Sequence, residues 1–274
     1  MSTTLSAPAA SAASPQAARP SYSPIPFRRI LSVELRKMFD TRSGFWLMAG
    51  VVGLALLASA GVVLFAPDEQ ITFDTFGAAV GIPMAVILPV IAILSVTGEW
   101  SQRSGLSTFT LVPHRGRVIA AKGLLAVAVG VVGMAAAFAV GAVGNVIGSQ
   151  LAGVDTVWNV GWQSFVLLTL GNVLGVMIGF TFGVLFRSSP GAIVGYFVYN
   201  YVLTGIAEVL AASQSWFRDS RGWLDFTYAQ NPLFQGDDRW LSATEWAHLA
   251  VTGLYWLVIP LAVGLVTVLR SEVK

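Results

Sequence analysis

The sequence predicts an all-α fold: a polytopic membrane protein with a six-helix transmembrane bundle and an N-terminal amphipathic connecting helix. Of the 274 residues, 55% are hydrophobic and only 11% are charged, whereas soluble domains are about 45–50% apolar. The apolar residues fall in runs of about 20, the length of helix that crosses ~30 Å of hydrocarbon. The membrane is therefore the expected environment of most of the chain.

Two segments precede the first apolar run. Residues 1–25 are rich in Ser, Ala and Pro with the single charge Arg19, which predicts a disordered cytoplasmic tail without a signal-peptide pattern. Residues 26–44 predict an amphipathic helix in the headgroup plane, and a charged juxtamembrane linker is the alternative. The apolar stripe of this helix consists of Phe27, Leu31, Leu35 and Met38.

Six apolar runs follow and make residues 26–274 one transmembrane domain. The third is long enough to tilt or to extend beyond the lipid. A proline at the start of the fifth run favours a tight hairpin after the fourth, because proline suits the first turn of a helix. The predicted spans are 45–65, 76–97, 123–149, 163–186, 190–212 and 246–269.

The lysines and arginines predict the orientation of these spans. With the N-terminus in the cytoplasm, 13 of the 16 basic residues lie inside, and only Arg218, Arg221 and Arg239 lie outside. The positive-inside rule therefore predicts that both termini are cytoplasmic, in a bacterial cell membrane. The 13 are Arg19, Arg28, Arg29, Arg36, Lys37, Arg42, Arg103, Arg115, Arg117, Lys122, Arg187, Arg270 and Lys274.

The sequence contains no pattern for chemistry of its own. It has no cysteine, which excludes disulfides and cysteine metal sites. It has no G-x-x-x-x-G-K-[ST] loop, H-E-x-x-H pair or G-x-S-x-G elbow, so we expect neither an enzyme nor a cofactor. A formal charge of +2 gives no basic field for nucleic acid.

Ionisable residues within the spans are rare. Glu208 is the main one, near the outer end of its span, where an interfacial or hydrogen-bonded role is favoured over an ion pathway. An ion-coupled carrier is expected to have acidic residues near the midplane. We therefore favour a transporter that takes its energy from a partner protein. The two alternatives are an ion-coupled carrier that uses Glu208 and a membrane scaffold.

Small residues mark a packing face on the fourth span. Four glycines at a four-residue spacing place no side chain between neighbouring helices, and this lets the helices approach closely. A sliding contact during transport and static bundle packing are the two interpretations. The glycines are Gly171, Gly175, Gly179 and Gly183.

The segment between the second and third spans, residues 97–122, is the most informative. Glu99 and Trp100 lie at the membrane exit, a Thr-rich stretch follows, and the run from Pro113 to Lys122 is PHRGRVIAAK. This pattern resembles the cytoplasmic coupling region of type-2 ABC exporter permeases, of the actinobacterial kind, with His114 and Ser104 as modest departures. The segment VELRKMFDTRSGFW, residues 33–46, is similar to the connecting helix of that family.

The resemblance implies a permease without an ATPase site, in which the 98–122 segment couples to a separate ATP-binding cassette ATPase and a second permease subunit completes the transporter. It also implies an outer cap or re-entrant helices in residues 213–245. A solvated loop that merely obeys the positive-inside rule is the alternative for 98–122. The cargo is not readable. The implied coupling residues are Glu99, Arg103, Arg115, Arg117 and Lys122, with Glu34, Arg36 and Lys37 on the connecting helix.

Overall fold

The computed structural model describes residues 25–39, 42–101, 115–236 and 238–270. Within these ranges every regular element is helical, and the sole β-type contact is an isolated bridge between Thr72 and Val157. Apart from Ile25, the predicted tail lies outside the described residues.

The elements follow one another as a series of helices, in which η1 and η3 are 3-10 turns and η2 and η4 are π-helical. In chain order they are α1 (Phe27–Phe39), α2 (Arg42–Phe65), η1 (Asp68–Gln70), α3 (Phe73–Ser101), α5 (Arg115–Ala152), α6 (Trp162–Phe186), α7 (Ser189–Phe197), η2 (Val198–Leu203), α8 (Thr204–Ser213), α9 (Ser215–Leu224), α10 (Phe226–Gln230), η3 (Asn231–Phe234), α11 (Ala243–Gly253), η4 (Leu254–Val258) and α12 (Ile259–Arg270).

Five helical stretches are long and apolar enough to cross a membrane, which makes the chain a multi-pass membrane-type protein. α2 covers the first predicted run, and its apolar part, Ala49–Phe65, is shorter. At 38 residues, α5 is about 57 Å long at 1.5 Å per residue and exceeds the hydrocarbon thickness. The five stretches are Phe73–Trp100, Arg115–Ala152, Trp162–Phe186, Ser189–Ser213 and Ala243–Arg270.

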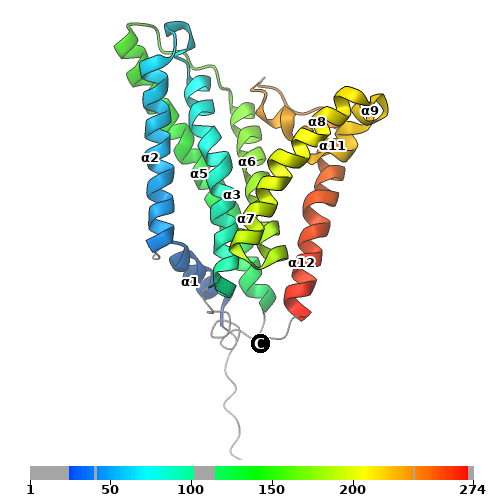
Figure 1. Cartoon of the computed structure of the whole chain (residues 1–274). Coiled ribbons are helices and arrows are strands. Elements are labelled where there is room, and N and C mark those ends of the chain that lie inside the picture. The colour runs from blue at the N-terminus through cyan, green and yellow to red at the C-terminus, as the bar shows by residue number, and fades with distance from the viewer. Residues whose placement is uncertain (1–24, 40–41, 102–114, 237, 271–274) are drawn as a thin grey trace, which may run out of the picture.

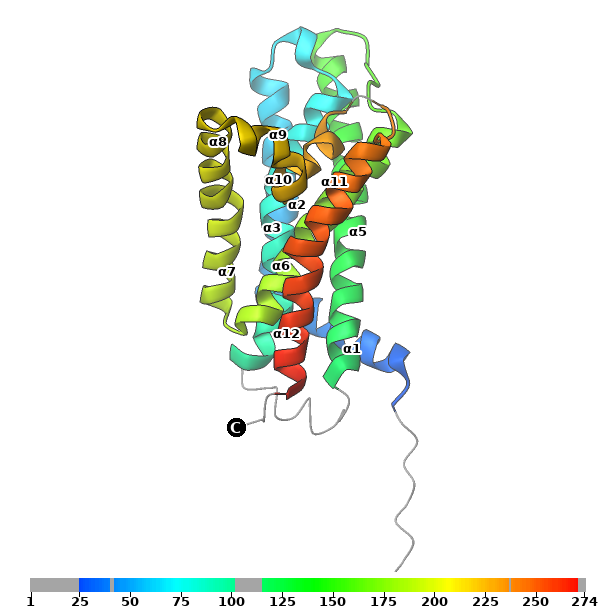
Figure 2. The ribbon, with the colours of Figure 1, turned by 90° about the vertical axis from the view of Figure 1, so that its right-hand side faces the viewer.

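α3 lies at the centre of a bundle and packs on α2, α5 and α6 (Figures 1 and 2). Phe76 is fully buried against two glycines of α5. A Cβ added to Gly144 would lie 2.7 Å from the Phe76 ring, and one added to Gly148 would lie 2.9 Å from it. Side chains at these two positions are therefore excluded by the close contact of α3 with α5.

A proline inside α3 joins this helix to α7. Pro89 has no N–H, so the carbonyl of Ala85, four residues earlier, has no partner within the helix. The Tyr196 hydroxyl of α7 donates a hydrogen bond to this carbonyl at 3.2 Å. The tyrosine thereby satisfies a backbone group that would otherwise be left unpaired at membrane depth.

The last two membrane-length stretches, α7–η2–α8 and α11–η4–α12, lean away from the bundle toward the end of the molecule that carries α9 (Figure 1). A π-helical segment interrupts each of them. The two segments meet where the rings of Tyr199 in η2 and Trp256 in η4 lie 5.4 Å apart. The Trp256 indole also donates to the Leu224 carbonyl at 2.8 Å, which connects this contact to α9.

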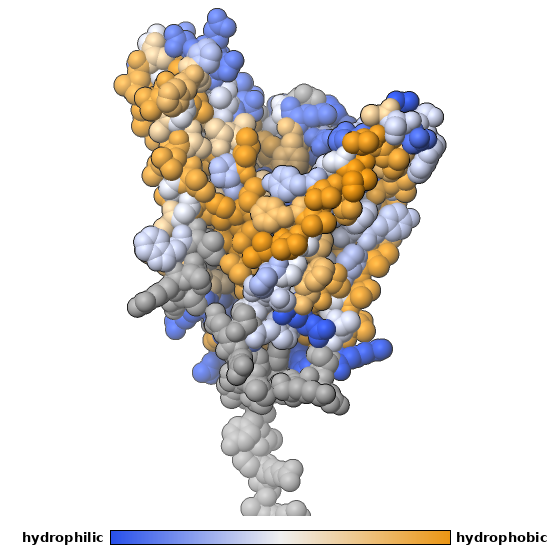
Figure 3. All heavy atoms as spheres, viewed as in Figure 1, coloured by the Kyte–Doolittle hydropathy of each residue, from blue (hydrophilic) through white to orange (hydrophobic). Residues whose placement is uncertain are grey.

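The surface of the molecule agrees with a lipid environment. Apolar residues cover the sides over α2 and along α7–α8, while hydrophilic residues gather at the two ends (Figure 3). Leu57 of α2 is 69% exposed and Val209 of α8 is 70% exposed. Apolar surface of this extent is typical of a face that contacts membrane or another protein.

α1 packs against α5 through Ile30 together with part of its predicted apolar stripe, since Leu31 and Met38 pack against buried clusters that include α5 residues. Ile30 and Glu34 are buried, and Ile30 contacts Val118 of α5. Phe27 and Leu35, two members of the stripe, remain exposed. The residues at positions 30 and 34 share one helix face, so a carboxylate enters the contact between α1 and the bundle.

Candidate functional site

Four charged side chains from three helices form a buried cluster at the end of the molecule where α1 lies. Glu34 and Lys37 are three residues apart on α1 and share a face. Glu99 occupies the end of α3, and Lys122 lies on α5, two turns after the helix begins. Residues 102–114, between α3 and α5, lie outside the described ranges. The charge cluster, defined as these four residues, therefore brackets that segment in the chain.

Each lysine of the charge cluster contacts both carboxylates. Lys37 Nζ lies 2.9 Å from Glu34 Oε1 and 3.0 Å from Glu99 Oε1. Lys122 Nζ lies 2.5 Å from Glu34 Oε2 and 3.2 Å from Glu99 Oε1. The two acids and two bases thus form a closed ring of ion pairs that ties α1 to both α3 and α5.

Burial makes these ion pairs strong and costly to break. The side chains of Glu34, Glu99 and Lys122 are 3%, 4% and 7% exposed, while that of Lys37 is 39% exposed. Isolated charges at such positions would pay a large desolvation cost, so each needs its partners. The cluster is electrically balanced, with two formal negative and two formal positive charges.

A backbone hydrogen bond holds Lys122 in place, and neighbouring carboxylates stabilise the charge of Lys37. The Lys122 ammonium donates to the Ser95 carbonyl of α3 at 2.8 Å, in addition to its ion pairs. Burial lowers the pKa of Lys37, but the carboxylates of Glu34 and Glu99 outweigh this and raise the pKa above its ordinary value. Lys37 is therefore positively charged at neutral pH, and the ion pairs of the cluster act as a tie between helices.

The other residues implied for coupling take different places. Arg115, at the start of α5, donates to the Val268 carbonyl near the end of α12 at 3.3 Å. Arg117 is half-buried and Arg36 is exposed on α1. Arg103 lies outside the described residues. The structure thus brings together Glu34, Lys37, Glu99 and Lys122 but leaves Arg36, Arg115 and Arg117 apart from the charge cluster.

The four glycines of α6 do not share one neighbour. A Cβ on Gly179 would lie 2.6 Å from the Pro89 carbonyl oxygen, and one on Gly183 would lie 3.2 Å from the Ile93 carbonyl oxygen, both on α3. A Cβ on Gly171 would lie 2.5 Å from the Phe234 ring of η3. Gly175 has no atom within 4 Å of that position. The face therefore divides between α3, η3 and open space.

A second ionic group lies at the opposite end of the molecule and was not identified from the sequence. The Arg221 guanidinium of α9 donates to both carboxylate oxygens of Glu208 at 2.6 and 2.9 Å. It also pairs with Asp225 at 3.0 Å and lies 4.5 Å from the Tyr228 ring centroid. Hydrogen bonding to Glu208 is the largest of the effects that raise the pKa of Arg221. Glu208, expected at an outer interface, thus has a hydrogen-bonded partner.

The signal for this second group was the position of Glu208 near the end of an apolar run. Its partner lies 13 residues later, beyond the reach of any single-helix pairing rule. The side chain of Glu208 is 61% exposed, and that of Arg221 is 8% exposed. The pair therefore fixes α9 onto the end of α8.

Within the described ranges no group of three or more His, Asp or Glu side chains is placed to hold a metal ion. No known family model matches this chain, and no curated protein matches it either. The geometry of the described residues therefore carries the functional argument.

Proposed function

We propose that this chain is the membrane-spanning permease of an ATP-driven exporter of the type-2 ABC kind, with six spans of which α2 is the first. ATP hydrolysis belongs to a separate ATP-binding cassette subunit, and a second permease subunit, a copy or a relative, completes the pathway. In this proposal α1 is the connecting helix at the cytoplasmic surface of a bacterial cell membrane.

The distribution of charge supports this orientation. α1, the start of α5 and the ends of α6 and α12 lie at one end of the molecule (Figure 1). These segments and the residue after α6 carry Arg28, Arg29, Arg36, Arg115, Arg117, Arg187 and Arg270. At the opposite end, η1 and the start of α3 carry Asp68, Glu69 and Asp74. Under the positive-inside rule, the α1 end is cytoplasmic and the α9 end faces outward.

The charge cluster is the observation that carries the proposal. It locks α1 to the end of α3 and to the start of α5, the two helices that the 98–122 segment joins. A force applied to that segment by an ATPase would move the three helix ends as one body, because separating the buried charges costs several kcal/mol. Rigid transmission of this kind is what coupling to an external motor requires.

The compensation of charge argues against an ion-coupled carrier. Glu34 and Glu99 are each paired with both lysines of the charge cluster, at one end of the bundle rather than at mid-depth. Glu208 pairs with Arg221 at the other end. A proton- or sodium-coupled carrier needs carboxylates that exchange an ion near the midplane, so an external energy source fits these residues better.

The test is coupling in a reconstituted complex. The chain is purified with its ATPase subunit, and ATP hydrolysis is measured with wild-type chain and with Glu99→Gln or with Lys37→Met, whose lysine is the more exposed of the two in the charge cluster. We expect each variant to insert and to assemble while the stimulation of ATP hydrolysis by the permease falls at least about tenfold, as for an interaction of about 1.4 kcal/mol or more. Undiminished stimulation in both variants would remove the proposal.

A further inference from the structure

A second feature, independent of the charge cluster, lies at mid-depth in the bundle. A cavity of about 140 Å³ is enclosed by α3, α6, α7–η2 and the α10–η3 turn. None of the residues that line it is charged, yet most are polar or aromatic. They are Ala85, Gly171, Asn172, Gly175, Ile178, Tyr196, Tyr199, Asn200, Thr227, Gln230, Asn231 and Phe234.

The cavity lies deep in the membrane-length helices. Ala85 is 12 residues into α3 and Gly171 is nine residues into α6, which at 1.5 Å per residue places them about 18 and 14 Å from the outer ends of these helices. Phe234 of η3 reaches this depth, because a Cβ on Gly171 would touch its ring. Irregular backbone is tolerated at membrane depth only where it is covered by protein or lines a cavity.

Interruptions in two helices supply polar groups to this place. Pro89 frees the Ala85 carbonyl, to which Tyr196 donates its hydroxyl. The π-helical segment η2 carries both Tyr199 and Asn200, and such segments are frequent at functional sites. Two unrelated breaks in regular α-helix therefore meet at one polar cavity.

Several hydrogen-bonding atoms of the lining remain available for a ligand. The amides of Asn172 and Gln230 donate to carbonyls of their own helices at 3.1 and 3.2 Å, which leaves their side-chain oxygens as acceptors. The Tyr199 hydroxyl is buried without a hydrogen bond of normal geometry, and the Thr227 side chain is near enough to interact with it. A buried polar group of this kind gains from a partner that a ligand supplies.

We propose that this cavity binds an uncharged molecule that carries hydroxyl or amide N–H groups on an apolar body. The acceptors of Asn172 and Gln230 match O–H or N–H donors, and Tyr199 pairs with either kind of group. Tyr196, Phe234 and Ile178 provide the apolar and aromatic walls. A charged head group would find no counter-ion among these residues and would pay its desolvation cost in full.

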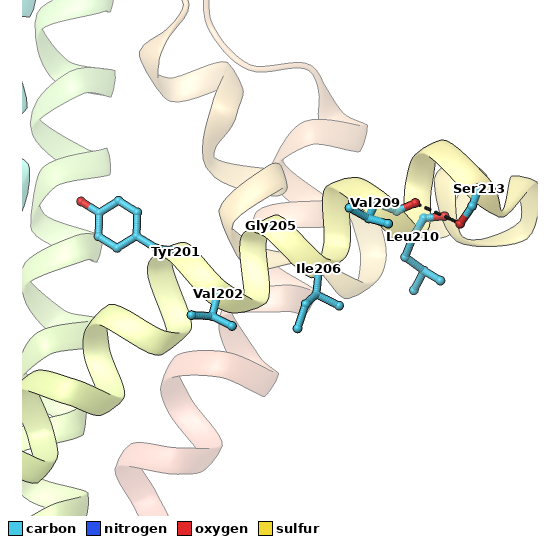
Figure 4. A pocket seen from close by; sticks show the side chains of 7 residues that line it. All are labelled: Tyr201, Val202, Gly205, Ile206, Val209, Leu210 and Ser213. Carbon is cyan, nitrogen blue, oxygen red and sulfur yellow. Dashed lines mark hydrogen bonds between the residues drawn. The ribbon is translucent and has the colours of Figure 1, made fainter.

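This site differs from the open groove on the outside of α7–η2–α8. The groove is larger, about 520 Å³, and mostly apolar. Val202, Ile206 and Leu210 project from the same side of the helix there (Figure 4). Tyr201, two residues after Tyr199, lines the groove rather than the cavity. The two tyrosines of η2 therefore offer a matched pair for an experiment.

The binding claim stands on this chain alone, whereas identifying the bound molecule as the cargo rests on the proposed function. Because the chain has no cysteine, a single Thr227→Cys substitution places one reactive thiol on the cavity wall. The purified chain is placed in phosphatidylcholine nanodiscs without ATP or ATPase, and the alkylation rate of the thiol is measured with N-ethylmaleimide. The probe is benzyl alcohol, because a cavity of about 150 Å³ accommodates a molecule the size of benzene, and benzoate, of similar size but with a charged carboxylate, is the comparison.

We expect benzyl alcohol to slow alkylation of the Thr227→Cys variant saturably, by about fivefold or more, and benzoate to have less than a twofold effect. A Ser213→Cys variant, whose thiol lies on the exposed groove, serves as the control and should be protected by neither. In the Thr227→Cys background, Tyr199→Phe should raise the half-protecting concentration about tenfold, as for one lost hydrogen bond. Tyr201→Phe should leave it unchanged within twofold.

Three outcomes overturn the proposal. Equal protection by both probes means that they act through the lipid. No protection by benzyl alcohol means that the cavity holds water only. Protection that survives both Tyr199→Phe and Gln230→Leu means that the lining does not recognise the probe. The second variant is included because Gln230 is half-buried, so that its substitution does not alter a fully buried position. If the cavity does not bind the probe but the chain still stimulates its ATPase, the ligand-binding proposal is wrong and the proposed function is unaffected.

Discussion

The ammonium of Lys122 on α5 lies 2.5 Å from a carboxylate oxygen of Glu34 on α1, and both side chains are almost completely buried. This ion pair joins a helix that precedes the bundle to α5, which begins within the 98–122 segment. It is the shortest contact in the charge cluster.

Replacing Lys122 should destabilise the protein severely. In Lys122→Met, Glu34 and Glu99 each lose one ion-pair partner, and the loss of one partner from a buried ion pair costs about 3–5 kcal/mol. The measurement is the free energy of unfolding in mild detergent. Arg29→Ala on the exposed side of α1 is the matched control and should change the free energy by about 0.5 kcal/mol or less. Equal effects of the two variants would contradict the burial of the cluster.

The pair should also show energetic coupling. In a double-mutant cycle of Glu34→Gln and Lys122→Met, the double variant should be more stable than the sum of the single effects predicts, by about 1–3 kcal/mol, because no buried charge is then left without its partner from this pair. Unfolding of all four proteins in the same detergent gives the coupling energy. Additive effects would mean that the two side chains do not interact.

Two glycines of α6 should respond oppositely to the same substitution. Gly179→Ala places a methyl group 2.6 Å from the Pro89 carbonyl oxygen of α3, and overpacking of this kind costs about 1–3 kcal/mol. Gly175→Ala meets no atom within 4 Å and should be neutral or stabilise by up to about 1 kcal/mol through helix propensity. Thermal unfolding distinguishes the two variants, and a larger loss in Gly175→Ala would refute the described packing of α6 on α3.

The Arg221 group predicts a difference between arginine and lysine. Arg221→Lys loses the two-oxygen fork to Glu208 and should lower the free energy of unfolding by about 1–2 kcal/mol. Arg218→Lys, on the same helix but exposed, should change it by less than about 0.5 kcal/mol. If both substitutions are silent, the guanidinium does not hold α9 onto α8.

The proposed orientation is testable because the chain has no cysteine. Ser32→Cys on α1 and Ser215→Cys at the start of α9 introduce thiols at exposed positions at opposite ends of the molecule. An impermeant maleimide applied to intact cells should label Ser215→Cys, while Ser32→Cys should react only after the membrane is opened. The reverse pattern would invert the topology.

The helical runs could be predicted from the sequence because each depends on local composition and length. The charge cluster could not. Glu34 with Lys37 and Glu99 with Lys122 were identified as members of two separate segments. Their meeting requires α1 to dock on α5 through Ile30 and only part of its apolar stripe. Lys37 and Glu99 are 62 residues apart, a separation that no helix periodicity encodes.

The cavity between α3, α6, α7–η2 and the α10–η3 turn could not be predicted from the sequence for the same reason. Asn172 and Asn200 lie within the predicted spans 163–186 and 190–212, but the hydrogen bond from Tyr196 to Ala85 spans 111 residues. It depends on a carbonyl that Pro89 leaves free, and on an α10–η3 turn that enters the bundle. Only the packed arrangement shows that these features share one place.

The proposed role as the permease of an ATP-driven exporter predicts that an ATPase subunit co-purifies with the chain and that its activity depends on the coupling residues. The tagged chain is purified from its native membrane, a co-purifying subunit is identified by its ATP-binding sequence, and ATP hydrolysis is measured for wild type, Glu99→Gln and Arg115→Ala. We expect a bound ATPase whose stimulated activity falls about tenfold or more in Glu99→Gln and also falls in Arg115→Ala. The complex should still assemble in both variants. Repeated purification without any ATP-binding subunit, or full stimulation in both variants, would contradict it.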